Sequence, residues 1–139
     1  AHDAPQALAI AAIRGFDADT VAKLRPFVTA LPARTPVNAN SAPAELLGAI
    51  LPEVSREELG ELVRARRAKP FKDRGDLKTR AAKAPAAAID AHLDVKSDHF
   101  LVQVAVTQDD VQVATEALVA RAAPGKSPAT AIIWRRALY

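Results

Sequence analysis

Few residues of this chain could carry out chemistry, and their spacing is not that of an active site. Ser97-Asp98-His99 contains the residue types of a nucleophile, an acid and a base, but three consecutive residues cannot converge as a catalytic triad does. His2, His92 and His99 lack the spacing of a zinc-binding helix. Gly125-Lys126-Ser127 lacks the upstream glycine of a phosphate-binding loop. We therefore expect a protein that is not an enzyme, with no catalytic and no cofactor-binding residue.

Metal binding is left open by the sequence. The chain has no cysteine, which excludes disulfides and thiolate metal sites, and it lacks the calcium loop of an EF-hand. Asp94, Asp98, Asp109 and Asp110 could supply oxygens to calcium. A hard cation needs several converging oxygens, however, and acidic residues at strand ends are usually only solvated. We therefore assign no metal ligand.

The basic residues are concentrated in one segment, although the net charge of the chain is only +3. Asp73 and Asp76 are the acidic residues within this segment. Such a segment can meet nucleic acid or an acidic protein surface, and it can also be a solvated basic helix end, which is the interpretation that we favour. Its members are Arg64, Arg66, Arg67, Lys69, Lys72, Arg74, Lys78, Arg80 and Lys83.

The 139 residues are enough for one domain or two small ones, with a core made mainly of Leu, Ile, Val and Ala. No apolar run reaches the ~20 residues that span a bilayer. The sequence shows neither an initiating methionine nor a signal peptide, so we expect a fragment or a mature form. Any membrane anchor would lie outside the given sequence.

Residues 1–93 are expected to form a helical domain. Leu8, Ile10 and Ile13 begin a short apolar segment that ends at Gly15. A helix beginning near Asp17 or Asp19 is expected to bury one stripe at helical spacing. The members of that stripe are Val21, Leu24, Phe27, Val28 and Leu31.

Later helices are predicted from caps and prolines. Asn40 or Ser41 is expected to cap the next helix, with Pro43 in its first turn. Ser55 and Glu58 form a capping box for a helix that Pro70 stops, and Phe71 is placed to pack under the following turn. Short helices are then expected around Leu77 and over residues 85–93.

Residues 94–139 are expected to form antiparallel strands, because the apolar period changes near Asp94. Phe100, Val102, Val104 and Val106 alternate with other residues before a hairpin turn at Gln108-Asp109-Asp110. A second strand begins at Val111, and residues 124–128 form a loop. A third strand over residues 129–136 places Ile132 and Trp134 on one face and Ile133 on the other. Such a three-stranded sheet needs one face covered.

Two stretches of the sequence resemble the minor pseudopilin of the K class in type II secretion systems. Members of that family carry a TPVNVNTAPAEVL-like segment, followed by a helix that ends in a basic run and Pro-Phe. Residues 35–47 and 62–71 show this pattern, and further similarity lies at residues 15–17, 24–29, 31–32, 97–100 and 134–136. The motif residues matched here, to which we assign a structural role, are Pro36, Val37, Asn38, Asn40, Ala42, Pro43, Pro70 and Phe71.

The resemblance implies an α+β chain. A helical domain, similar to SAM and helix-hairpin-helix domains, would be inserted in a pilin-like fold, and residues 94–139 would supply its closing strands. The long N-terminal helix of that fold would lie outside this chain and provide its only contact with the membrane. The family acts at the tip of the pseudopilus, on the periplasmic side of the inner membrane of Gram-negative bacteria. Its partners are the I and J minor pseudopilins and secreted substrates. Some members bind calcium, and no ligand is carried over from them.

An alternative interpretation uses the same residues. The segment from Asn38 to Leu46, the basic helix and Pro70-Phe71 also resemble helix-hairpin-helix DNA-binding modules. Those modules meet DNA phosphate through backbone N–H groups of a glycine-rich hairpin. The corresponding segment here has no glycine, and it contains Pro52 and Glu53, so we expect no binding of nucleic acid.

Overall fold

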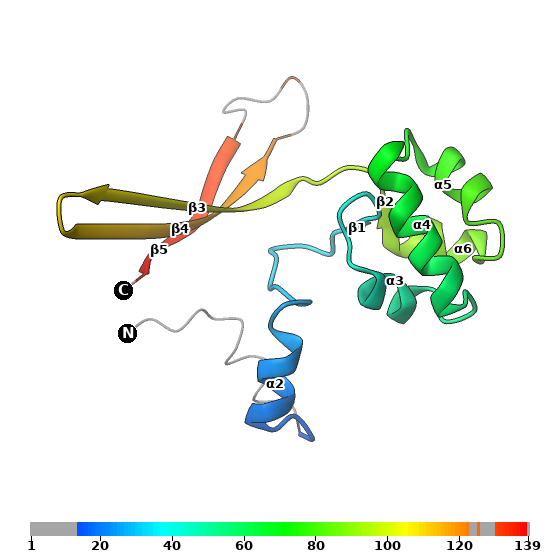
Figure 1. Cartoon of the computed structure of the whole chain (residues 1–139), viewed down its shortest axis with the longest axis horizontal. Helices are drawn as coiled ribbons and strands as arrows, with labels where there is room; N and C mark the ends of the chain where they lie inside the picture. The colour runs from blue at the N-terminus through cyan, green and yellow to red at the C-terminus, as the bar shows by residue number, and fades with distance from the viewer. Residues whose placement is uncertain (1–13, 123–124, 126–129, 139) are drawn as a thin grey trace. The chain divides into compact units, whose positions relative to one another are not determined.

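The computed structural model describes residues 14–122, 125 and 130–138, and it has the expected α+β class (Figure 1). The chain divides into two compact units, Ala1–Asp94 and Val95–Tyr139. We call them the helical unit and the sheet unit. The expected apolar segment at Leu8, Ile10 and Ile13 and most of the expected loop at residues 124–128 lie outside the described residues. Among the described residues, no helix combines the length and the apolar character that a membrane span requires.

The first described helix, α2 (Ala18–Leu24), is shorter than the sequence predicts. Asp17 caps it by accepting a hydrogen bond from the Thr20 amide, and Val21 is its buried residue. The expected continuous stripe is wrong beyond Leu24, because Phe27 and Val28 are exposed. Pro26 explains the early end of the helix, since proline has no amide hydrogen to donate to the preceding turn.

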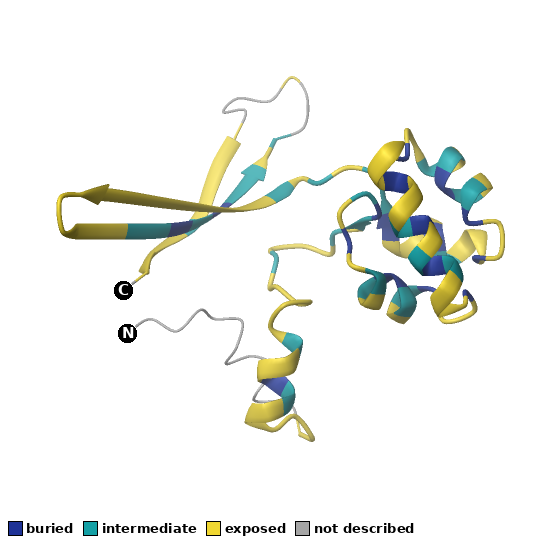
Figure 2. Ribbon diagram, viewed as in Figure 1, coloured by how far each residue is buried: buried dark blue, intermediate teal, exposed yellow. Residues whose placement is uncertain are grey.

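The core of the helical unit lies between its later helices (Figure 2). They are α3 (Ala44–Ile50), α4 (Arg56–Ala68), α5 (Arg74–Arg80) and α6 (Ala86–His92). Its fully buried large side chains are Leu47, Leu51, Leu77, Ile89 and Leu93. The capping box of α4 is confirmed, because the Ser55 hydroxyl accepts from the Glu58 amide while the Glu58 carboxylate accepts from the Ser55 amide.

A short parallel ladder, which the sequence did not predict, joins the two ends of this core. Strand β1 (Val37–Asn38) pairs with β2 (Leu93–Asp94), with Val37 opposite Leu93. The Ala39 amide extends the ladder by donating to the Asp94 carbonyl over 2.7 Å. Such a two-residue pairing has no periodicity to detect, and it arises only because α6 brings Leu93 back to the start of the core.

The sheet unit is the expected antiparallel meander, with strand order β3-β4-β5. The strands are β3 (His99–Gln108), β4 (Val111–Arg121) and β5 (Thr130–Leu138). Asp109, at the hairpin turn, has a positive φ of 52°, a conformation that aspartate tolerates better than most residues. The prediction of three strands after Asp94 is confirmed.

A β-bulge in β5 changes which side chains share a face. Leu118 pairs with Trp134 and its neighbour Val119 pairs with Ile132, so Ile133 is the extra residue. Paired residues project to the same face, whereas Leu118 and Val119 project to opposite faces. The expectation that Ile132 and Trp134 share a face is therefore wrong.

The register gives the sheet one apolar face and one mixed face. The apolar face carries Phe100, Val102, Val104, Val106, Val111, Val113 and Ile132, all of them exposed. The mixed face carries Glu116, only 4% exposed, which pairs with Arg136 over 2.6 Å and accepts from Gln103 over 2.8 Å. The hydrogen bond from Gln103 and the positive charge of Arg136 lower the pKa of Glu116 despite its burial.

Candidate functional site

The motif residues gather around the turn that follows β1, which we call the motif loop (residues 38–42). The Asn38 carbonyl accepts from the amides of Ser41 and Ala42, and its side-chain oxygen accepts from the Asn40 amide over 2.9 Å. Ala39 and Ala42 are buried in this turn. The loop is therefore a compact structure held by its own backbone before α3 begins.

Asn40 ties the motif loop to the segment after α4. Its side-chain amide donates to the Phe71 carbonyl over 3.0 Å, and its side-chain oxygen accepts from the Phe71 amide over 2.8 Å. The predicted capping role of Asn40 or Ser41 is wrong: Pro43 is the N-cap of α3, and no side chain caps that helix. Asn40 instead pairs with the Phe71 backbone as a neighbouring strand would. Phe71 is 3% exposed, and the guanidinium carbon of Arg80 lies 4.3 Å from the centroid of its ring.

Arg66 is a buried cation on α4 that binds two backbone carbonyls of the motif loop. Its guanidinium donates to the carbonyls of Ala39 over 2.5 Å and Ala42 over 2.6 Å, and only 9% of the residue is exposed. Burial, and secondarily the charge of Arg67, lowers the pKa of Arg66, although arginine stays protonated in proteins. The basic run predicts that Arg66 is solvated, and for this residue the prediction is wrong. Its helical spacing from Leu59 and Leu62 was the signal that could have placed it on the buried face of α4.

The remaining motif residues mark the borders of this arrangement. Pro36 precedes β1, Pro43 precedes α3, and Pro70 separates α4 from Phe71, and all three are exposed. Prolines at these positions end or precede regular structure without removing a needed donor. The motif residues thus form a loop and the borders of the regular structure around it, and Arg66 and Asn40 bind this loop to α4 and to Phe71.

We expect Asn40→Ala to lower the free energy of unfolding of the helical unit by about 2 kcal/mol, because it leaves the Phe71 amide and carbonyl without partners. Urea denaturation followed by circular dichroism measures the change. Ser41→Ala is the matched control, since Ser41 is exposed and its hydroxyl makes one long hydrogen bond, 3.3 Å, to the Asn38 carbonyl. Equal losses in the two variants would contradict the role of Asn40.

The other candidate residues are not brought together. Ser97 and Asp98 use their carbonyls to accept from the guanidinium and the amide of Arg121, which fixes the turn before β3 as expected. Asp98 and Asp109 lie near opposite ends of β3, and Asp94 pairs with Arg74 over 2.9 Å. Within the described ranges, no three His, Cys, Asp or Glu side chains are grouped closely enough to hold a metal ion.

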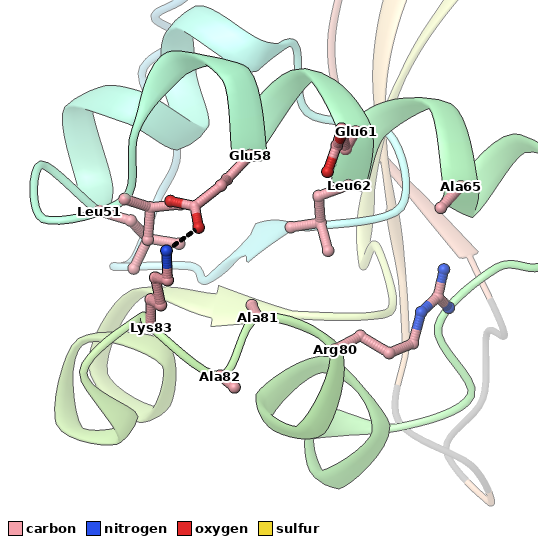
Figure 3. Close-up of a pocket in the computed structure, with 10 residues that line it drawn as sticks. Leu51, Glu58, Glu61, Leu62, Ala65, Arg80, Ala81, Ala82 and Lys83 are labelled. Carbon is pink, nitrogen blue, oxygen red and sulfur yellow. Dashed lines mark ion pairs between the residues drawn. The ribbon is translucent and has the colours of Figure 1, made fainter.

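A groove of about 440 Å³ lies along α4, between that helix and the turn after α5 (Figure 3). Leu51, Leu62 and Ala81 line it, and an ion pair between Glu58 and Lys83 crosses one end (Figure 3). The charged side chains in its lining are Glu58, Glu61, Arg80 and Lys83. Three of them are held in ion pairs, Lys83 with Glu58 and Arg80 with Asp76.

Comparisons with known proteins agree with this geometry. Residues 37–96, which include the motif loop, Arg66 and Phe71, match the family described as type II secretion system (T2SS), protein K. The fold is similar to that of a chain in the crystal structure of the GspK-GspI-GspJ complex from the type 2 secretion system of enterotoxigenic Escherichia coli. The TM-score of that match is 0.73, at 21% sequence identity. It covers 98% of this chain and 49% of the other, so this chain spans about half the length of its structural relative. A search of curated proteins finds no match.

The structural match shows the fold of this chain, and the family match covers residues 37–96. The resemblance of the sequence to the K class of minor pseudopilins is confirmed. The family match supports the class, and the structural match supports the fold.

Proposed function

We propose that this chain is part of a minor pseudopilin subunit at the tip of the type II secretion pseudopilus. It assembles there with the I and J minor pseudopilins, initiates pseudopilus formation and supports protein export without catalysing a reaction. The family match over residues 37–96 is the observation that carries this proposal, because it contains the whole motif loop and its clamp. The location that follows is the periplasmic side of the inner membrane of a Gram-negative bacterium.

The domain organisation supports the same proposal. In this proposal the helical unit would be the domain inserted in the pilin-like fold, and the sheet unit would supply its closing strands; the division of the chain into two compact units is consistent with that assignment. A long N-terminal helix outside this chain would then cover the apolar face of the sheet. This face carries Phe100, Val104 and Ile132, whose exposure would be costly in a finished subunit.

Co-purification with the I and J minor pseudopilins of the same source tests the proposal. The full periplasmic region that contains this chain should form a stable complex with both partners on size-exclusion chromatography. The matched control is the same region carrying Arg25→Gln, an exposed change outside the motif contacts and outside the basic segment, which should also bind. Failure of the folded region to bind either partner would refute the proposal.

We predict that the chain does not bind duplex DNA at physiological salt. Pro52 lacks an amide hydrogen, the Val54 amide donates to the Leu51 carbonyl, and the Ser55 amide donates to Glu58. The hairpin donors that such modules offer to phosphate are therefore largely used within the chain. Fluorescence anisotropy with labelled duplex DNA should show none of the usual non-specific affinity, Kd of about 10⁻⁴–10⁻⁶ M. A salt-dependent micromolar Kd would instead favour the DNA-binding alternative.

A further inference from the structure

Arg34 and His92 are exposed side chains that lie far apart in the sequence and meet beside the ladder of β1 and β2. The Nη2 atom of Arg34 lies 3.2 Å from the Nδ1 atom of His92. A guanidinium can only donate hydrogen bonds, so Nδ1 is the acceptor and carries no proton. This hydrogen bond therefore exists only while the imidazole is neutral.

The pair lies at the end of the ladder where both strands begin. Arg34 comes shortly before β1, and His92 is the last residue of α6, directly before β2. Because the two strands are parallel, their first residues lie side by side. The ladder is very short, and its other end is extended by the hydrogen bond from the Ala39 amide to the Asp94 carbonyl. A contact at its first residues is therefore placed to control how often the ladder opens.

Protonation of His92 removes the acceptor and adds a second positive charge beside the guanidinium of Arg34. Water weakens the repulsion between two exposed cations but does not abolish it at hydrogen-bond distance. The last turn of α6 favours the protonated ring, because cations are stabilised near the C-terminal end of a helix. His92 thus has a different partner in each charge state.

The carboxylates on either side of His92 in the sequence are already held by other cations. Asp90 pairs with Lys78 over 2.7 Å, and Asp94 pairs with Arg74 over 2.9 Å. Helix α5 packs against α6, and each of its charged side chains belongs to an ion pair. These side chains are Arg74, Asp76, Lys78 and Arg80. Strand β1 carries no charged side chain, so a protonated His92 has no unpaired carboxylate on these elements to offset Arg34.

We propose that the hydrogen bond between Arg34 and His92 is a pH-sensitive latch on the ladder of β1 and β2. The latch is closed while His92 is neutral, and it opens as the pH falls through the range between 8 and 5 in which histidine gains a proton. The direction follows from the charges, because the neutral ring accepts from Arg34 whereas the protonated ring repels it. The ladder is therefore held more firmly at the higher pH.

Hydrogen exchange followed by NMR on the full 139-residue chain tests the latch, at about pH 7.5 and about pH 5.5 and with correction for intrinsic exchange rates. The Ala39 amide, which is bonded across the ladder, should lose at least about threefold of its protection at the lower pH. The Leu59 amide, which donates to the Ser55 carbonyl within α4, should change by less than about 1.5-fold. Equal loss at both amides would mean general destabilisation and would overturn the proposal.

Variants assign the effect to the two side chains. H92Q retains an uncharged acceptor, and R34Q removes the cation, so each should reduce the pH-dependence at Ala39 to less than about 1.5-fold. H2Q/H99Q removes the other two histidines of the chain and should keep the threefold loss of the unmodified chain. Matching circular dichroism spectra of the variants exclude loss of the fold.

Three results would overturn the latch. The first is an unmodified chain whose Ala39 protection does not depend on pH. The second is a pH-dependence that persists in H92Q or disappears in H2Q/H99Q, because another group would then be titrating. The third is a pH-dependence that persists in R34Q, because His92 would then act only through the end of α6.

Discussion

Arg66→Met should lower the free energy of unfolding of the helical unit by about 3 kcal/mol, one of the largest effects expected of a single change in this chain. The substitution leaves the carbonyls of Ala39 and Ala42 without their donor inside the protein. A buried polar group without a partner costs about 1–3 kcal/mol, and hydrogen bonds from a charged donor are stronger than neutral ones. Urea denaturation followed by circular dichroism measures the loss.

Arg66→Lys separates geometry from charge. A lysine keeps the positive charge but lacks the planar fork that reaches two carbonyls, so a loss of about 1–2 kcal/mol is expected. Arg67→Met is the matched control on the same helix, and because Arg67 is exposed its effect should stay within about 0.5 kcal/mol. If Arg66→Met cost no more than Arg67→Met, the clamp would not stabilise the motif loop.

Hydrogen exchange on the isolated chain should show a second large effect: strand amides near Val104 exchange at least about 100-fold faster than those near Leu62. The ratio corresponds to about 2.7 kcal/mol of opening free energy. Leu62 is buried in the helical unit, whereas Val104 and its neighbours on the apolar face are exposed. Each Å² of apolar surface left in water forfeits about 25 cal/mol, so the sheet gains little from its largest apolar surface.

Paired substitutions sharpen this prediction. Val106→Thr, on the apolar face, should change stability by less than about 0.5 kcal/mol, since the side chain is already exposed. Leu62→Ala should cost about 2–5 kcal/mol, because it opens a cavity in the core of the helical unit. Equal protection near Val104 and Leu62, or a large loss from Val106→Thr, would mean that the sheet is stable without further cover.

The sequence predicted those features that depend on neighbours along the chain. The capping box of Ser55 and Glu58, the short helices around Leu77 and before Leu93, and the hairpin at Asp109-Asp110 all follow from local hydrogen bonding and periodicity. The α2 helix was predicted too long because the apolar spacing was given more importance than Pro26, which removes a backbone donor.

The candidate site was predicted only in part. The resemblance to a family identified the motif residues. No local pattern could show that Asn40 forms hydrogen bonds with Phe71, because the packing of α4 against the motif loop brings the two residues together. The β-bulge at Ile133 could not be predicted from the sequence either, because an extra residue in one strand is defined only by its register with the neighbouring strand.

By itself, the sequence determined the α+β class, the order of helices before strands and the position of the motif, because periodicity, caps and prolines act over a few residues. The tertiary structure alone decided which cations are buried, paired or free. Arg66, Arg67 and Lys69 are close together in one basic run, yet the first is a buried clamp and the others are exposed. The environment of a side chain depends on the face of the helix on which it lies and on the backbone carbonyls that distant segments bring against it. Local composition determines neither of these.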